Sequence, residues 1–263
     1  MANGERLFYV LRSGENYGRM GVTSGELWLA DLRTGRNERL LPGVIVTSFD
    51  VSSDGQKIVY SAGEPASRSG IWMAWTDNRM APRLLSHGPD LFPRFGGGHL
   101  YVVGVDGNVN YLYRMREDGS GRQKVSGTPI LILLELSPDG KWAFVWGGLP
   151  DNQAISRFLL APTDGGRAIT FCQYCSVSWS PDAKELYVSP ERAGEPARTY
   201  AIPFINGPSA ELLAAGGDDG EKLAKLTGTS MIEHNEIALG RDPSVYAFVN
   251  VMIHRNLYQI PVP

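Results

Sequence analysis

LSPDGKWAFV, at residues 136–145, places a tight turn between two apolar segments. Proline at the second position of a turn fixes φ, and Asp-Gly tolerates the left-handed conformation that follows. The flanking segments are rich in Trp, Phe and Val, which favour strands. The stretch therefore predicts two short strands joined by a turn.

The same phrase recurs along the chain at a nearly constant interval. Two clear and two degenerate copies accompany the first: Phe49–Tyr60, Trp179–Val188, Phe92–Tyr101 and Gly240–Tyr246. Successive turns follow one another at 43, 42 and 43 residues, and the step to the final turn is 60 residues. A pitch of roughly 40–45 residues with four strands per unit is typical of a β-propeller.

A second phrase, a strand followed by a Gly or Asp turn, alternates with the first. It has six copies: Glu26–Gly35, Gly70–Trp75, Tyr111–Gly119, Arg157–Gly165, Thr199–Pro203 and Asn256–Pro261. Sheets whose strands are apolar on both faces bury those faces by stacking on one another. The sequence therefore predicts an all-β fold, a β-propeller of about six four-stranded blades with the first and last blades incomplete.

These repeats resemble the WD-repeat-like propeller repeats of the TolB-type family, and the likeness runs from Arg6 to Pro261. The repeat is specific for the fold and not for a function, because it occurs in binding proteins, peptidase gating domains and sensor modules. In bacteria, similar arrays are appended to receptor-type serine/threonine kinases and to winged-helix regulators. The resemblance therefore implies a bacterial propeller module that binds or senses a partner.

The ends and one insertion depart from the regular repeat. Asn3-Gly4 stands where Asp-Gly stands in other repeats, so the innermost strand of the first blade would lie upstream. The chain also closes on the third strand of the last blade, and we expect residues 1–263 to be one propeller domain cut from a longer chain. The insertion Ala214–Lys222 predicts a long loop, within the one region, Ala210–Leu226, that has a helical pattern.

The composition argues against nucleic-acid and membrane partners. The net charge is −3, from 25 basic and 28 acidic residues, and no basic stripe is present. The most apolar run, Pro129–Leu134, is far shorter than the roughly 20 residues of a membrane span. Met1–Arg6 lacks the pattern of a signal peptide. We expect a monomeric domain within a larger chain, with no direct membrane insertion.

Cys172-Gln173-Tyr174-Cys175 is the only cysteine motif. A zinc site needs four ligands, and the sequence has no second Cys pair and no His-x-x-x-His. The pair precedes a predicted strand and not the helix of a thioredoxin-like motif. A structural disulfide between Cys172 and Cys175, or two plain thiols, is therefore favoured over a metal or redox role. Oxidation would suit an extracytoplasmic location, which we favour over the cytoplasm.

Catalytic and cofactor motifs are missing from the sequence. It has no Gly-x-Ser-x-Gly, no Walker loop and no His-Glu-x-x-His. Asp106–Asn110 could ligate calcium but lacks the other carboxylates of a 12-residue loop, so a plain turn is favoured. We therefore predict no metal and no cofactor. Paired acids could still serve a glycosidase, and the candidates come from different blades: Asp90, Glu135, Asp151 and Glu236.

One face of the predicted propeller carries the chemical variety. It is formed by the loops between second and third strands and by the loops that lead into each inner strand, whereas the Ser-Pro-Asp-Gly turns lie opposite. Binding residues concentrate on loops held by a rigid scaffold. We therefore predict the ligand contacts on this loop-rich face: Tyr17, Arg19, Asp90, Asn108, Asp151, Asn152, Tyr174, Arg192 and His234.

The leading functional hypothesis is a non-catalytic binding or sensing module for a protein, peptide or small ligand, as the sensor domain of a larger signalling protein. The alternative is a hydrolase or lyase, or a peptidase gating propeller, with carboxylates and His234 at the channel mouth. A tight polar cluster around His234 would favour the enzyme. A large apolar patch on the rim would instead favour a scaffold for assembly.

Overall fold

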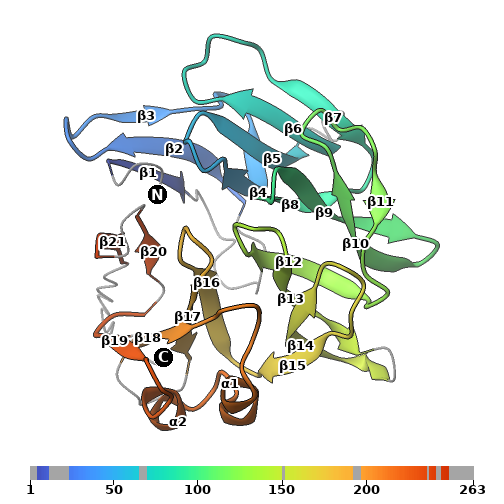
Figure 1. The fold of residues 1–263 in the computed structure, drawn as a ribbon. Coiled ribbons are helices and arrows are strands. Elements are labelled where there is room, and N and C mark those ends of the chain that lie inside the picture. Colours follow the sequence, from blue (N-terminus) through green and yellow to red (C-terminus); the bar gives the residue numbers. More distant parts are fainter. Residues whose placement is uncertain are drawn as a thin grey trace, which may run out of the picture.

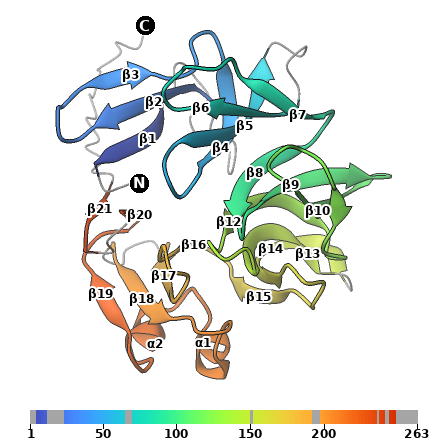
Figure 2. The same ribbon diagram turned by 45° about the horizontal axis from the view of Figure 1, so that its top comes forward.

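The sheets of this protein are arranged around a central axis, as Figures 1 and 2 show. The computed structural model describes residues 5–11, 24–64, 70–149, 152–191, 197–235, 237–240 and 244–248. Within these ranges the strands form six antiparallel sheets, and each sheet is built from consecutive strands of the chain. The architecture is a β-propeller.

The first sheet has three strands and the next four sheets have four each. The strands of the first two sheets are β1 (Arg6–Leu11), β2 (Glu26–Asp31), β3 (Asn37–Arg39), β4 (Ile45–Val51), β5 (Lys57–Glu64), β6 (Gly70–Trp75) and β7 (Arg83–His87). The third sheet contains β8 (Leu91–Gly96), β9 (His99–Asp106), β10 (Val109–Met115) and β11 (Gln123–Lys124). The fourth contains β12 (Ile130–Leu136), β13 (Trp142–Leu149), β14 (Asn152–Pro162) and β15 (Ile169–Cys172).

The fifth sheet contains β16 (Cys175–Trp179), β17 (Glu185–Pro190), β18 (Thr199–Pro203) and β19 (Ser230–Ile232). The sixth sheet consists, among the described residues, of β20 (Ala238–Leu239) and β21 (Tyr246–Ala247), and it lies next to β1 in both views (Figures 1 and 2). The described residues thus form five blades and a two-stranded sixth sheet. The prediction of an all-β propeller with four-stranded blades is confirmed, and the five blades described are close to the predicted six.

Alternation along each second strand explains how the blades stack. On β5, Ile58 and Tyr60 join the apolar cluster shared with the first blade, while Val59 joins the cluster shared with the third. On β13, Phe144 packs toward the fifth blade, and Val145 packs toward the third. Because successive side chains of a strand point to opposite faces, each blade is buried on both sides. Five such clusters fill the junctions between successive sheets in the described part of the chain.

The Ser-Pro-Asp-Gly turn is held by its own serine and aspartate. Ser137 Oγ donates to Asp139 Oδ1 at 2.7 Å and accepts from the backbone N–H of Trp142 at 2.9 Å. Ser52 and Ser180 repeat this pattern with Asp54 and Asp182. The recurring serine and aspartate are therefore needed to fix the turn, which agrees with their structural interpretation from sequence.

The insertion in the fifth blade differs from the long loop that the sequence predicts. It contains the short helices α1 (Ala210–Ala215) and α2 (Gly220–Ala224), which lie between β18 and β19. Ser209 and Asp219 cap their N-termini, and Leu212 and Leu223 are buried in the adjacent core cluster. The helical pattern of Ala210–Leu226 is confirmed, and the loop expected over Ala214–Lys222 is partly helical because two caps and two apolar anchors suffice to fold the segment. No helix in the described ranges is long and apolar enough to cross a bilayer.

Candidate functional site

A cavity of about 520 Å³ lies at one end of the central axis. It is lined by the last residues of the inner strands β4, β8, β12, β16 and β20 and by the turns that follow them. Leu7 and Phe8 of β1 complete the wall on the side of the first blade. The cavity therefore lies toward the Ser-Pro-Asp-Gly turns, at the end of the channel opposite the loop-rich face. Its volume is in the range of roughly 300–1,000 Å³ that small-ligand pockets have.

Asp50 forms part of this wall and links two inner strands. Its Oδ2 accepts the backbone N–H of Phe95 at 2.7 Å, and its Oδ1 accepts the N–H of Val51 at 2.9 Å. Burial raises the pKa of Asp50, while the nearby Arg94 guanidinium and the two N–H groups oppose that rise. Both oxygens are thus engaged, and Oδ2 holds β4 against β8.

Arg94 projects from β8 and joins three consecutive blades. Its Nε and Nη2 donate to the carbonyl oxygen of Leu134 on β12 at 3.0 and 2.7 Å. Its Nη1 lies within hydrogen-bond distance of Ser48 Oγ and the carbonyl oxygens of Phe49 and Pro93, at 3.1, 3.2 and 2.9 Å. The guanidinium therefore satisfies strand carbonyls at the inner edge of the blades, where the ladder of each sheet ends.

Glu135, on β12, is the third charged residue of this wall, and its environment differs from that of Asp50. It is half-buried, and within the described residues no hydrogen bond or ion pair engages its carboxylate. Burial raises the pKa of Glu135 to about 7; Arg94 lowers it, and the negative charge of Asp50 raises it further. A carboxyl group of this kind changes charge near neutral pH.

Two further titratable side chains stand at the rim of the cavity. His99 Nδ1 lies 2.9 Å from the carbonyl oxygen of Gly97, and Glu117 forms a 2.6 Å ion pair with Lys57 of the second blade. In the described part of the chain, no group of three His, Cys, Asp or Glu side chains could hold a metal ion. The cavity thus offers one carboxylate, that of Glu135, without a protein partner among the described residues.

Only some of the sequence-predicted ligand contacts can be placed in the structure. Tyr17, Arg19, Asp151 and Arg192 lie outside the described residues, as does the side chain of Asn152. None of the four that are described lines the cavity: Asp90, Asn108, Tyr174 and His234. They come from the third, fifth and sixth sheets, at the ends where inner strands begin or second strands turn back. No hydrogen bond or ring contact joins any two of these four, and their ligand role stays a prediction.

Asp90 has a structural partner. Its side chain is 5% exposed, and Arg122 Nη2 lies 2.9 Å from its Oδ1, with the guanidinium also 3.6 Å above the Tyr113 ring. Ser86 donates a further short hydrogen bond to its Oδ2. Asp90 therefore ties the end of the second blade to the third.

Asn108 and His234 have different surroundings. Asn108 is exposed in the two-residue turn between β9 and β10, where Asp106 pairs with Lys124 at 3.2 Å, which fits the plain turn favoured from sequence. His234 stacks on Phe248, with ring centroids 3.7 Å apart, and its carbonyl accepts the Thr199 hydroxyl. Within the described residues no carboxylate is hydrogen-bonded or ion-paired to the His234 ring.

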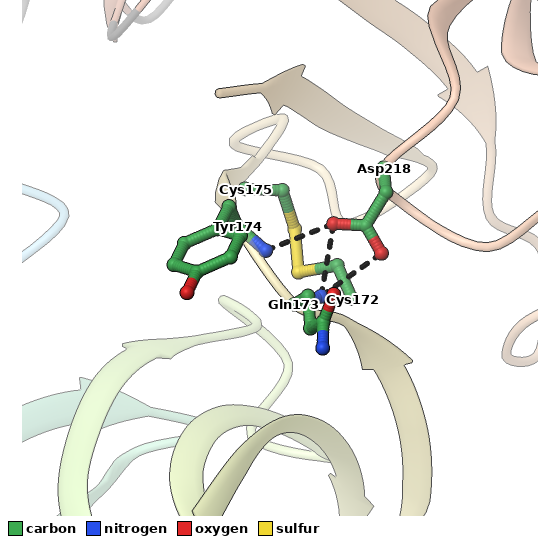
Figure 3. The surroundings of a disulfide bond; sticks show 5 residues. All are labelled: Cys172, Gln173, Tyr174, Cys175 and Asp218. Carbon is green, nitrogen blue, oxygen red and sulfur yellow. Dashed lines mark hydrogen bonds between the residues drawn. A yellow bond between two sulfur atoms is a disulfide. The ribbon is translucent and has the colours of Figure 1, made fainter. Parts of the chain in front are cut away.

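Cys172 and Cys175 are joined in a disulfide between the outermost strand of the fourth blade and the innermost strand of the fifth. Figure 3 shows the Asp218 carboxylate beside it, accepting the backbone N–H groups of Gln173 and Tyr174 at 2.8–2.9 Å. Of the alternatives left open by the sequence, the structure contains the disulfide. The insertion thereby caps the loop that the disulfide closes.

Sequence reasoning finds Glu135 as one acid among several but misses Asp50 and Arg94. The signal is nonetheless present: each is a single charged residue within the short inner-strand segments IVTSFDV and LFPRFG. A charge on a strand that must pack between two blades needs a partner, and neighbouring inner strands supply it here.

No protein-family model matches this chain, and no curated protein matches it in sequence. Solved structures do match it. TolB from Acinetobacter baumannii has a TM-score of 0.53 at 16% identity, over 69% of this chain and 48% of TolB. A putative TolB from Agrobacterium tumefaciens has a TM-score of 0.51 at 17% identity, over 73% of each chain. The fold is a TolB-like β-propeller.

Other propellers match this TolB-like fold as well. A chain from the mitotic checkpoint complex has a TM-score of 0.51 at 10% identity, over 94% of this chain and 82% of that one. The alignment with Acinetobacter TolB spans about half of that protein's length, 48%. At such identities the similarity shows the fold alone, since one fold hosts many functions.

Proposed function

We propose that this TolB-like propeller is a non-catalytic binding module that recognises a protein partner at its loop-rich face. The observation that carries the proposal is the exposure of large apolar side chains near the axis at that face. Leu91 and Leu131 are 40% and 49% exposed near the starts of β8 and β12, and Tyr174, 59% exposed, directly precedes β16. These three inner strands belong to consecutive blades.

The exposed apolar residues at the opposite face have a different placement. Leu32, Met80 and Ile205 are also exposed, but they lie in turns that follow the third strand of their blades, away from the inner strands. Single exposed apolar residues are ordinary on a protein surface. Repetition at the same end of three neighbouring inner strands is not, and aromatic and aliphatic anchors of this kind are typical of the centre of a protein interface.

Two further observations support the proposal. The mitotic checkpoint complex, from which one similar propeller comes, is an assembly of proteins. The Cys172–Cys175 disulfide suits an oxidising compartment, so we place the recognition event outside the cytoplasm. The resemblance to appended sensor arrays extends the proposal to a sensing role within a larger signalling protein.

The hydrolase or lyase alternative receives less support from the polar groups of the described residues. Paired-carboxylate catalysis needs two acids that are free to exchange protons or attack. In the cavity both oxygens of Asp50 accept backbone N–H groups, which leaves Glu135 alone. At the other end His234 packs on an aromatic ring.

Site-specific photo-crosslinking tests the proposed face. A photo-reactive residue at Tyr174 is expected to capture one defined protein from the native source, and the same residue at Ile205 is not. Leu131→Ser is expected to abolish the Tyr174 crosslink, whereas Ile205→Ser leaves it intact. Equal capture from both positions, or capture unaffected by Leu131→Ser, would contradict the proposal. Turnover of any substrate by the purified domain would contradict its non-catalytic part.

A further inference from the structure

We infer that the cavity at the turn side of the channel is a second binding site, and that it takes an organic monocation, an ammonium or guanidinium group, on the Glu135 carboxylate. This inference goes beyond the proposed function, because it concerns the opposite end of the channel from the loop-rich face. The ligand group could belong to a small molecule or to a peptide side chain. Both present the same chemistry to the site.

The charged groups of the cavity wall differ in whether they have hydrogen-bond partners. Asp50 is satisfied by two backbone N–H groups, and Arg94 donates to carbonyl oxygens of its own strand and both neighbouring inner strands. Glu117 is paired with Lys57. Glu135 alone has no hydrogen bond or ion pair within the described residues, although it is half-buried. A carboxylate removed from water without a partner is costly, and a ligand that donates N–H groups to it would relieve that cost.

The net charge of the cavity wall determines the sign of the ligand's charge. The charged groups that face Glu135 come from several elements: Asp50 on β4, Arg94 on β8, His99 on β9, and Glu117 after β10 with its partner Lys57. Arg94 balances one of the two acids Asp50 and Glu135, and the Lys57–Glu117 pair is neutral. With Glu135 ionised and His99 left out of the sum, the described wall carries one uncompensated negative charge, which selects a monocation over an anion or a neutral group.

The volume of the cavity and its apolar lining limit the size and shape of the ligand. A cavity of about 520 Å³ is large enough for a ligand that carries the cation on an apolar stem. Leu7, Phe8, Phe49 and Leu136 line the same cavity and would contact that stem. A charged head on an aliphatic chain therefore fits the site better than a bare inorganic ion.

Titrations with defined cations test this inference on the whole chain. The probes are n-butylammonium, n-butylguanidinium, the blocked peptide acetyl-Ala-Lys-Ala-amide, and neutral n-butanol, each followed by calorimetry and by backbone amide shifts. Saturable binding of the cations, with none for n-butanol, is expected. Preference for the peptide over the two small cations identifies a peptide side chain as the natural source, and the reverse preference identifies a small molecule.

The role of Glu135 is tested with a nearly isosteric variant and by pH. Glu135→Gln is expected to abolish cation binding, whereas Glu211→Gln, the same change of charge on exposed α1, leaves it unchanged. Because burial raises the pKa of Glu135 to about 7, wild-type affinity is expected to rise roughly tenfold between pH 6 and pH 8. Histidine also changes charge near neutrality, so His99→Gln is measured in parallel and is expected to retain most of that rise.

A carboxyl-carbon titration of the wild-type protein keeps the test decisive if Glu135→Gln is unstable. The titration midpoint of Glu135 is expected to fall when n-butylammonium is added, since the cation favours the ionised form. Equal binding of n-butanol, unchanged binding in folded Glu135→Gln, or a midpoint that does not move with the cation would overturn the inference. None of these outcomes bears on the loop-rich face.

Discussion

Ala183 occupies a backbone position that glycine fills in the matching turns. Its φ is 59°, and the equivalent Gly55 and Gly140 have φ of 71° and 73°. A residue with a Cβ is destabilised by roughly 1–2 kcal/mol in this left-handed region. Glycine removes that strain but lowers the free energy of unfolding by about 0.4–1 kcal/mol, because its unfolded chain has more conformational freedom. Ala183→Gly is therefore expected to stabilise the propeller by about 0.5–1 kcal/mol.

Thermal and urea unfolding measure this change. The expected shift in Tm is about +1 to +4 °C for a domain of this size. Two controls separate backbone strain from collision: Gly35→Ala has φ of 71° with nothing within 4 Å of the new Cβ, whereas at Gly140 a Cβ would lie 2.9–3.1 Å from backbone atoms of Gly96 and Gly97. Gly140→Ala is expected to cost more than Gly35→Ala. An unchanged or lower Tm for Ala183→Gly would refute the strain argument.

Three other perturbations test the polar contacts. Arg122→Met leaves the buried Asp90 carboxylate without its cation and should destabilise the fold by about 2–4 kcal/mol in urea, with part of the loss recovered when Asp90→Asn is added. Replacing Cys172 and Cys175 with serine should cost only about 2 kcal/mol, because the closed loop is short, so loss of folding at 25 °C would contradict the entropic account. The pKa of Asp182 is lowered by a serine hydroxyl and a backbone N–H, so its stabilising effect is present above its unfolded value of about 3.9 and is lost as the pH falls through the lower folded value. Asp182→Asn should therefore make the free energy of unfolding, measured with urea, depend less on pH between pH 5 and pH 2.

The repeat makes the architecture predictable from sequence, because each copy carries its own turn chemistry. Ser137, Pro138 and Asp139 fix a turn locally, and the spacing of such turns then counts the blades. The α1–α2 segment escapes this logic, since its short helices depend on burial of Leu212 and Leu223 against the fifth blade. The helical pattern of Ala210–Leu226 indicates the helices, but their burial against the blade has no local signal.

The candidate site is harder to predict than the fold for a similar reason. Asp50 and Arg94 are 44 residues apart in the chain, and Arg94 and Glu135 are 41 residues apart, so the three meet only when inner strands of three blades converge. The sequence shows which loops are long and chemically varied, and it therefore predicts ligand contacts at the loop-rich face. The Glu135 carboxylate lies at the other end, and only the hydrogen bonds of the described residues show that it has no partner among them. Asp90 shows the opposite case. Its position in a loop predicts a ligand contact, whereas in the structure its carboxylate forms a buried ion pair with Arg122.

The two proposed sites share one strand, which allows their independence to be tested. Leu131 lies near the start of β12 and Glu135 near its end, a separation of roughly 13 Å at the rise of a strand. Between them, the carbonyl oxygen of Leu134 is fixed by two donors of Arg94, so backbone movement at one end is resisted before it reaches the other. Coupling between sites requires an element with two arrangements that both ligands bias. We therefore expect Leu131→Ser to leave n-butylammonium affinity within twofold of wild type. Arg94→Met removes the hydrogen bonds to Leu134, so in that background we expect Leu131→Ser to change the affinity. A larger effect of Leu131→Ser alone in calorimetry would contradict the independence of the two sites, because it would show that a change at one end of β12 reaches the other.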